Sequence, residues 1–349
     1  MIIHNKFIGG NIFVDRIEGQ HVYLRNEQRD TMEVNGKDRF YWAFVVEGAE
    51  GQELTFHFGK RRLGIFGPAV SHDLFEWHWL DQNEDRSFTY KFGENESKVY
   101  FAHHILYHPA HFSAFLERNN LQGEELCKSR KGHSIPCLRI GDGKRSIILT
   151  ARHHACESVS NYILEGLVDE LIARPIADTR ILMVPFIDYD GVVDGDQGKN
   201  RYPHDQNRDY IDAPIYPEIR ALIAYAEEYG CHYGFDFHSP GHSDKRIFMM
   251  NNSKPERLNR FSEILVEEHI EGGLRYAPEK KPSERVAVSK ISTGTFSSYM
   301  NLRPENLLAL TLETTYTGTE TSRITPESLR IFGKGFANAI RRFIGEMEG

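Results

Sequence analysis

The sequence predicts an antiparallel β-sandwich at the N-terminus, followed by an α/β domain with helices on both faces of its sheet. Two observations predict this fold class. Short runs rich in aromatic and β-branched residues, separated by turn residues, fill the chain up to about residue 104. Beyond them, apolar runs of strand length alternate with helical patterns. A chain of 349 residues is too long for one small hydrophobic core. We therefore expect a sandwich domain at 1–105 and a second domain at 106–349.

The expected strands of the sandwich are residues 12–24, 40–46, 54–58, 75–80, 88–92 and 99–103. All three tryptophans lie in this region, and we interpret them as core or inter-domain packing: Trp42, Trp77 and Trp79. Four histidines follow at its end: His103, His104, His108 and His111. A metal site is one interpretation of this histidine cluster, and a polar seam between the domains is the favoured alternative.

The second domain is expected to begin with a helix at 109–117 and a polar connector at 118–132. Further strands are expected at 135–140, 146–149, 180–186, 232–237 and 307–312. Further helices are expected within 150–172, around 213–229, and at 255–270 and 327–347. Strands that alternate with helices in this way favour one sheet covered on both faces.

The composition is that of a folded protein, with 40% apolar residues and a net charge of −8. The negative charge argues against a nucleic-acid partner. The four cysteines form no CxxC pair, the N-terminal residues do not resemble a signal peptide, and no apolar run approaches membrane-spanning length. We therefore expect a cytoplasmic protein without a membrane partner; the sequence does not indicate an oligomeric state.

One pair of residues suggests metal chemistry. His154 and Glu157 are three residues apart at the expected start of a helix, where this spacing places both side chains on one face. Zinc accepts such a nitrogen and carboxylate pair, and a catalytic zinc also needs a third ligand and an open position. A single pair of this kind is about what chance gives, and the alternative is a surface pair at an ordinary helix start.

Three later segments carry residues that suit such a site. His238 follows an apolar strand, at the sheet edge where α/β proteins bind ligands, and is either a third zinc ligand or a capped loop residue. Asp236 could orient a ligand or be a buried structural aspartate. Glu313 ends a very apolar strand, where a buried carboxylate is costly unless it acts as a base or forms a salt bridge. Asn207-Arg208 could bind a carboxylate. Taken singly, Arg201 and Lys199 are interpreted as solvated loop residues.

Together these segments resemble the zinc carboxypeptidases, and most closely the cytosolic carboxypeptidase branch. The matching motifs occur in the family's order: His154-Ala155-Cys156-Glu157, Asn207-Arg208, Asp236-Phe237-His238-Ser239 and Leu312-Glu313. The segments RFYWAFVVEGAEGQELTFHF and GPAVSHDLFEWHWLD resemble the β-sandwich that precedes the catalytic domain in this branch. The resemblance covers nearly the whole chain, and four ordered motifs are far more specific than one.

The resemblance implies an α/β/α zinc carboxypeptidase domain with a mixed sheet, Zn²⁺ as cofactor, and the C-terminus of a peptide or protein as substrate. It implies that His154, Glu157 and His238 bind zinc and that Glu313 is the general base. It also implies that Asn207, Arg208 and Arg201 bind the terminal carboxylate of the substrate. Tyr299 is the candidate for the family's substrate-contacting tyrosine, with Tyr316 as the alternative. This branch commonly removes glutamate, and Lys199, Arg201, Lys245 and Arg246 are expected near the site, which suggests a preference for acidic C-terminal residues. The alternative is that these are surface charges, or that Asp194, Asp196 and Asp244 neutralise them.

The chain departs from the family in two places. His153 and His154 stand side by side before Glu157, so His153 is a second candidate ligand, and the loop between Arg201 and Asn207 is short. Two alternative functions remain. A related amidohydrolase of the desuccinylase or aspartoacylase type would cleave an N-acyl amino acid, although such relatives do not normally carry a sandwich. A non-catalytic peptide-binding protein on this scaffold is the other, although an intact ligand set argues against it.

Overall fold

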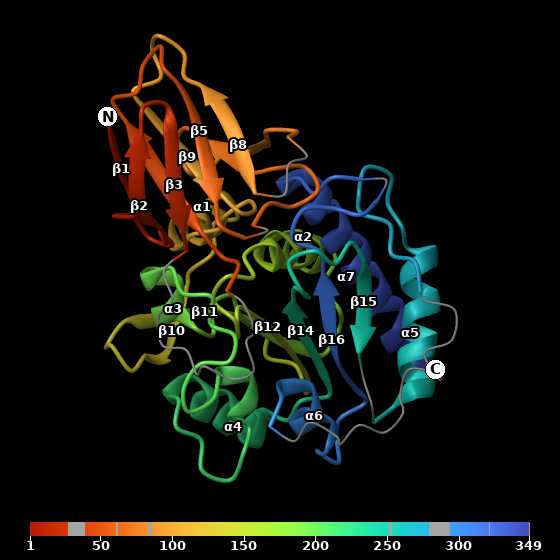
Figure 1. Cartoon of the computed structure of the whole chain (residues 1–349). Helices are drawn as coiled ribbons and strands as arrows, with labels where there is room; N and C mark the ends of the chain where they lie inside the picture. The colour runs from red at the N-terminus through yellow and green to blue at the C-terminus, as the bar shows by residue number, and fades with distance from the viewer. Residues whose placement is uncertain are drawn as a thin grey trace.

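The structure is a computed structural model that describes residues 1–26, 39–60, 62–82, 86–250, 253–278, 294–320 and 322–348. Figure 1 shows the N-terminal strands, in red and orange, stacked at one end of a larger α/β part in yellow to blue. The predicted order of a sandwich followed by an α/β part is confirmed. The boundary at residue 105 stays a prediction.

Two sheets form the sandwich. One has the strand order β1-β4-β9-β6-β7 and the other the order β2-β3-β5-β8. Every pair is antiparallel, as predicted, except the parallel pair β3–β5. The expected strand at 12–24 is a hairpin that turns at Gly19. The bounds are β1 Ile2–His4, β2 Phe13–Glu18, β3 His21–Arg25, β4 Ala43–Glu47, β5 Glu53–Phe58, β6 Ala69–Ser71, β7 His78–Trp79, β8 Ser87–Lys91 and β9 Lys98–Ala102.

Strand β4 shows how alternation divides the sandwich between two cores. Phe44 and Val46 face the interior between the two sheets, together with Trp42. Ala43 and Val45 face the opposite side and belong to a core shared with the α/β part, as do Trp77 and Trp79. The Trp79 indole Nε1 donates to the carbonyl oxygen of Ile324 at 2.7 Å, far along the chain. The interpretation of the tryptophans as core and inter-domain packing is therefore confirmed.

The α/β part is built on a mixed sheet with the order β10-β11-β13-β12-β14-β16-β15. The central strands β13, β12, β14 and β16 are parallel, and the outer strands β10, β11 and β15 run antiparallel to their neighbours. Strand β10 lies where a polar connector was expected, and β15 was not predicted. The bounds are β10 Glu124–Lys128, β11 Ser134–Ile140, β12 Arg145–Ala151, β13 Thr179–Val184, β14 Tyr233–His238, β15 Ile247–Met250 and β16 Leu308–Thr314.

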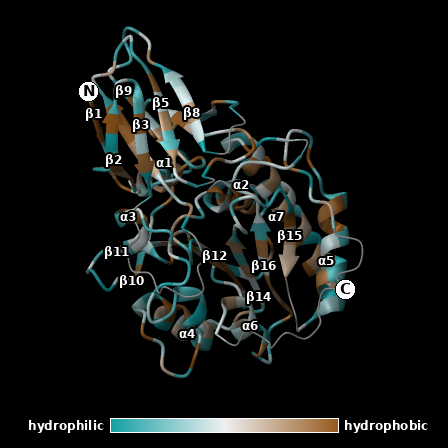
Figure 2. Ribbon diagram, in the orientation of Figure 1, coloured by the Kyte–Doolittle hydropathy of each residue, from teal (hydrophilic) through white to brown (hydrophobic). Residues whose placement is uncertain are grey.

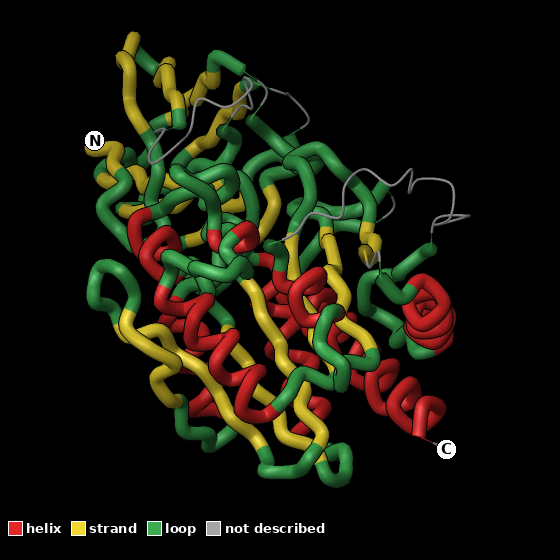
Figure 3. The backbone as a smooth tube through the Cα atoms, turned by 90° about the horizontal axis from the view of Figure 1, so that it is seen from below, coloured by secondary structure: helices red, strands yellow, loops and turns green. Residues whose placement is uncertain are grey.

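Helices cover both faces of this sheet (Figure 3). Ile147 and Leu149 of β12 pack into the core formed with α2, α5 and α7, whereas Ile148 packs toward α4 and α6. Figure 2 shows both hydrophobic and hydrophilic residues on α5, as expected of a helix with one buried face. The bounds are α1 Pro109–Arg118, α2 Val159–Ala173, α3 Tyr189–Asp194, α4 Pro217–Tyr229, α5 Pro255–Glu267, α6 Phe296–Asn301 and α7 Pro326–Glu348. Among the described residues, no helix combines the length and apolar character needed to cross a lipid bilayer.

Candidate active site

The carboxyl ends of three neighbouring parallel strands define the site. In β14, Phe237 is paired with Ala151 of β12 on one side and with Leu312 of β16 on the other. His238 is paired with Glu313 in the same register. Because parallel strands end at one edge of a sheet, the residues that follow β12 meet His238 and Glu313 there.

His154 and Glu157 lie in a turn between β12 and α2. The prediction that they share the first turn of the helix is wrong, because α2 begins at Val159. The backbone N–H of Glu157 donates to the His154 carbonyl at 3.1 Å, which closes the turn. The buried Arg152 guanidinium holds this turn, since its Nη1 donates to the carbonyl oxygen of Tyr107 at 3.1 Å and its Nε to that of Ala155 at 2.6 Å. The turn still brings His154 Nδ1 within 3.0 Å of Glu157 Oε1.

The predicted metal ligands converge on one point. His238 Nδ1 lies 2.8 Å from Glu157 Oε2 and 3.2 Å from His154 Nδ1. One ligand atom from each residue lies within 4.8 Å of the other two. Burial opposes ionisation of Glu157, but Lys199 and the two imidazoles keep its pKa well below the ordinary value. An ionised carboxylate opposite two imidazole nitrogens is a donor set that zinc accepts, so these residues fit the metal that the sequence implied.

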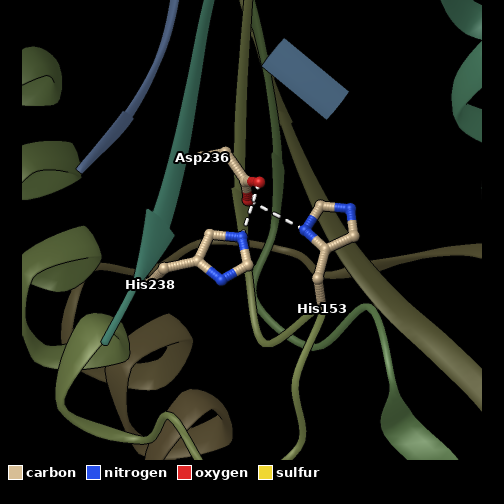
Figure 4. A group of neighbouring side chains, drawn as sticks. All are labelled: His153, Asp236 and His238. Atoms are coloured by element: carbon tan, nitrogen blue, oxygen red, sulfur yellow. Dashed lines mark hydrogen bonds and ion pairs between the residues drawn. The ribbon is translucent and has the colours of Figure 1, made fainter. Parts of the chain in front are cut away.

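A second group, formed by His153, Asp236 and His238, shares His238 with the ligand cluster and contacts its Nε2 atom (Figure 4). His238 Nε2 is 2.7 Å from Asp236 Oδ2, and His153 Nδ1 is 2.8 Å from Asp236 Oδ1. These three side chains also satisfy the spacing of a metal site. Burial lowers the pKa of His153, so its imidazole is neutral. The sequence hypothesis that Asp236 orients a ligand agrees with this geometry.

Glu313 lies beside the ligand cluster. Its side chain is partly exposed, but its Oε2 is buried and has no hydrogen-bond partner among the described residues. Burial raises the pKa of this carboxyl group, while His238 and Lys199 oppose the rise. A carboxylate that combines an unpaired oxygen with an elevated pKa can take up a proton at the site.

The structure places Asn207 and Arg208 in a short 3₁₀ helix, Gln206–Arg208. Asn207 is buried; its Oδ1 accepts from Phe296 N at 3.0 Å, and its Nδ2 lies 3.1 Å from His238 Nε2. Arg208 is exposed, and its Nη1 donates to the Asn207 carbonyl at 2.7 Å. Arg208 is therefore the exposed member of this pair, and its guanidinium can reach a ligand from the solvent side.

Arg201 occupies a different environment. Its Nη2 pairs with Asp188, and its Nη1 lies 3.0 Å from Asp196 Oδ2. Although burial opposes the charge, the two carboxylates raise the pKa of the guanidinium. Because these buried partners already bind Arg201, its predicted contact with substrate would require an exchange of partners. The interpretation of Arg201 as a solvated loop residue does not match this placement.

The tyrosine candidates differ in accessibility. Tyr299 on α6 is half-buried, with its ring 5.8 Å from that of Tyr210. Tyr316 is fully buried, and its hydroxyl lies 3.4 Å from Cys156 Sγ. A substrate contact by Tyr299 stays a prediction, and the placement of Tyr316 is that of a core residue beside the site.

Lys199 has a contact that the sequence analysis did not predict. We expected a solvated side chain, but Lys199 Nζ lies 2.7 Å from Glu157 Oε1 and donates to the carbonyl oxygens of Ser239 at 2.7 Å and Pro240 at 3.1 Å. The preceding Gly198 has φ +80°, and a Cβ there would lie 2.4 Å from Ala155 N, so glycine permits the close approach of the two loops. This glycine was the one available signal, because no periodicity marks a loop lysine as buried.

The histidines that follow the sandwich form a neutral seam. His104 Nε2 contacts the Cys156 carbonyl oxygen at 2.7 Å, and His103 Nδ1 lies 3.0 Å from His104 Nδ1. Burial lowers the pKa of His104 to about 3, and that of His108 also to about 3. Neither metal-site group found among the described residues includes these histidines. The polar-seam interpretation agrees with this arrangement.

Comparison with solved structures agrees with the fold that the motifs implied. A metallo-carboxypeptidase from Burkholderia cenocepacia superposes with a TM-score of 0.80 at 19% identity, over 99% of each chain. A metallo-carboxypeptidase from Pseudomonas aeruginosa, solved in complex with (2-guanidinoethylmercapto)succinic acid, gives a TM-score of 0.77 at 19% identity over the whole of both chains. The chain therefore has the fold of the metallo-carboxypeptidases throughout, sandwich included.

The sequence is also similar to cytosolic carboxypeptidases, as the motifs indicated. Cytosolic carboxypeptidase 3 of Mus musculus is 30% identical over 189 residues, which cover 46% of this chain. The matched segment spans only 18% of that longer protein. No protein-family model matches the chain.

Proposed function

We propose that this protein is a zinc-dependent carboxypeptidase that removes C-terminal residues from peptides or proteins in the cytoplasm. The observation that carries the proposal is the convergence of His154 Nδ1, His238 Nδ1 and the Glu157 carboxylate within 4.8 Å, beside the unpaired Oε2 of Glu313. The metallo-carboxypeptidase fold over the full chain supports the same conclusion.

In the proposed site, His154, Glu157 and His238 hold the metal. Zinc supplies a Lewis acid that polarises the scissile carbonyl and acidifies a water molecule. Glu313 accepts the proton of the attacking water on its unpaired oxygen and passes it to the leaving amine, which converts the amine into a good leaving group. Lys199 contacts Glu157 Oε1, the same oxygen that faces His154, and so helps to keep the carboxylate in place.

A carboxypeptidase must also hold the free carboxylate of its substrate. The exposed guanidinium of Arg208, at the rim beside Asn207, is our proposed clamp. The Pseudomonas aeruginosa relative was solved with a derivative of succinic acid, a dicarboxylate, which supports a site that receives carboxylates. Arg201 and Tyr299 are assigned a secondary role because both have protein partners already.

The finer part of the proposal is a preference for acidic C-terminal residues. Lys245 and Arg246 are exposed just before β15, whose residue Phe248 is paired with Glu313. Asp244 partly neutralises this charge, since its Oδ1 accepts from Arg246 Nε at 2.8 Å. Peptides that differ only in a last residue of Glu, Asp, Leu, Phe or Lys test the preference. Faster release of Glu and Asp, reduced in Arg246→Ala, is the expected result, and faster release of Leu, Phe or Lys would contradict it.

The decisive experiment on activity compares a peptide with a free C-terminus and the same peptide amidated. The zinc-loaded protein should shorten only the free peptide, one residue at a time by mass spectrometry. Arg208→Ala should weaken cleavage of the free peptide strongly, since a charge-assisted bond exists only there. Release of an acyl group from N-acyl amino acids without peptide cleavage would favour the amidohydrolase. Tight peptide binding without any cleavage would favour a binding protein.

A further inference from the structure

A buried chain of hydrogen bonds runs from the ligand cluster into the interior. Asp236 lies at its centre and is 1% exposed. Its Oδ2 contacts His238 Nε2 at 2.7 Å, and its Oδ1 contacts both His153 Nδ1 and Thr150 Oγ1 at 2.8 Å. His153 Nε2 in turn lies 2.8 Å from the Tyr210 hydroxyl. Figure 4 shows the two imidazoles on either side of the Asp236 carboxylate.

The chemistry of these groups fixes where the protons lie. An ionised carboxylate only accepts hydrogen bonds, so Thr150, His153 Nδ1 and His238 Nε2 all donate to Asp236. With its Nδ1 proton committed, the neutral His153 imidazole accepts from Tyr210 at Nε2. His238 Nε2 lies 2.7 Å from the Asp236 carboxylate and 3.1 Å from the Asn207 amide nitrogen. The shorter contact, to the carboxylate, holds the proton on Nε2, so Nδ1 is the nitrogen that a cation can take. That atom points to His154 and Glu157.

This arrangement also decides between the two overlapping groups that have the spacing of a metal site. Binding at His153, Asp236 and His238 would displace the hydrogen bonds that both carboxylate oxygens already accept. The group of His154, Glu157 and His238 instead sets two Nδ1 atoms face to face at 3.2 Å, beside a carboxylate. A cation would therefore complete the group of His154, Glu157 and His238, whereas it would disrupt the group of His153, Asp236 and His238.

We propose that His153 is a positioning residue for the metal centre. It orients Asp236, and through Asp236 it holds His238 with Nδ1 turned toward the metal. The inference rests on the proposed function, because it assigns His238 as a zinc ligand. It also gives a role to His153, which the sequence left as an alternative ligand beside His154.

Zinc affinity of purified protein tests this role without any substrate. In His153→Leu the donor to Asp236 is lost and the apolar volume is largely kept, so the affinity for Zn²⁺ should fall about 10- to 100-fold. In His153→Asn the side-chain amide can donate from nearly the position of Nδ1, so affinity should return close to that of the wild type. Competition with a chromogenic chelator measures both. The absorption spectrum of Co²⁺-loaded protein should shift in the leucine variant alone.

The variants separate positioning from folding. Thermal unfolding of the metal-free proteins shows whether each variant is folded; if His153→Leu is not, Thr150→Val removes the other donor to the same oxygen and should lower Zn²⁺ affinity as well. Unchanged Zn²⁺ affinity and an unchanged Co²⁺ spectrum in a folded His153→Leu variant would overturn the positioning role of His153 and leave the proposed function standing. An asparagine variant as weak as the leucine variant would do the same, since it would indicate packing. Absence of Zn²⁺ binding by the wild type would overturn the proposed function too.

Discussion

At the scale of single residues, the site combines two carboxyl groups whose pKa values shift in opposite directions. Glu157 is held ionised by Lys199 and two imidazoles, whereas burial raises the pKa of Glu313. These opposite shifts agree with the proposed roles, because a ligand must stay deprotonated and a base must be able to take a proton. Under the proposed function, Glu313 can therefore be changed without removing the metal.

Glu313→Gln should retain zinc and lose at least about two orders of magnitude in kcat, the usual size of a general-base contribution. The amide keeps the shape of the side chain but cannot accept the proton from water. Metal analysis and steady-state kinetics on one preparation measure both effects. Loss of zinc would mean that Glu313 is a ligand, and undiminished turnover would rule out the mechanism.

Glu218 is a carboxyl group outside the site whose protonation should affect stability. It lies in the first turn of α4, is 3% exposed, and has one partner at long range, the Gln206 amide at 3.4 Å. Burial raises its pKa from 4.5 to about 7, and Asp188 adds to the rise. Between these two pH values the folded protein keeps a proton that the unfolded chain releases. The free energy of unfolding therefore decreases as the pH rises from 4.5 to about 7.

Glu218→Gln should remove this pH dependence. Above pH 7 the wild type should have lost roughly 3 kcal/mol of its free energy of unfolding through this group. The variant should therefore be more stable than the wild type at pH 8. At pH 4.5 the two should be nearly equal. Urea unfolding at both pH values measures this, with Glu227→Gln at an exposed position of the same helix as control. A stability gain of the same size at both pH values would contradict the explanation.

At the scale of elements, periodicity predicted the regular structure and missed what contacts between elements decide. Strands β12, β14 and β16 and helices α2, α5 and α7 were predicted because their apolar residues recur at strand or helix spacing. Strand β10 was missed because its exposed residues Glu124 and Glu125 read as a connector, and pairing with β11 makes it a strand. Edge strands depend on a partner more than on their own composition.

The candidate site shows the same division. His154, Glu157, His238 and Glu313 could be proposed from motif order, because each follows a recognisable strand. The turn that holds His154 and Glu157 could not be predicted from the motifs, because contacts of Arg152 with Tyr107 and Ala155 fix it. The burial of Lys199 and the ion pairs of Arg201 also depend on distant segments that no local pattern encodes.

Helices α2 and α7 provide a test of packing between elements. Their backbones meet at two glycines: a Cβ on Gly333 would lie 2.1 Å from the Ile163 carbonyl oxygen, and one on Gly166 would lie 1.9 Å from that of Arg330. Since backbone cannot move aside as a side chain can, Gly333→Ala should force the helices apart. We expect a loss of about 1–3 kcal/mol or more in the free energy of unfolding.

Gly345→Ala on the same helix is the matched control, because its added Cβ meets nothing within 4 Å. Alanine there should be neutral or stabilising by up to about 1 kcal/mol, as expected for an exposed helical position. Denaturant unfolding of the two variants measures the difference. Equal changes in the free energy of unfolding would show that both substitutions act through helix propensity and that close packing at Gly333 does not contribute.

At the scale of the whole molecule, the sandwich is joined to the site by direct contacts. Gln197 Oε1 accepts from the backbone N–H groups of Phe40 at 2.8 Å and Tyr41 at 3.2 Å, and Asn11 Nδ2 donates to the Gly195 carbonyl at 2.7 Å. The loop held in this way carries Lys199, which contacts the proposed ligand Glu157. The sandwich therefore supports one wall of the site.

The shared core predicts that both parts unfold as one unit. All three tryptophans lie in the sandwich region, so their fluorescence reports on it, whereas far-UV circular dichroism at 222 nm reports mainly on the helices of the α/β part. Because Trp77 and Trp79 pack into the core formed with α2 and α7, the two signals should change at the same denaturant concentration. The proposed zinc site lies in the other part of the molecule, yet Zn²⁺ should shift both transitions equally, since a ligand stabilises the whole cooperative unit that it binds. Equilibrium urea titrations with and without Zn²⁺ measure this. A fluorescence transition that separates from the dichroism transition, or that zinc leaves in place, would show that the sandwich folds independently of the site.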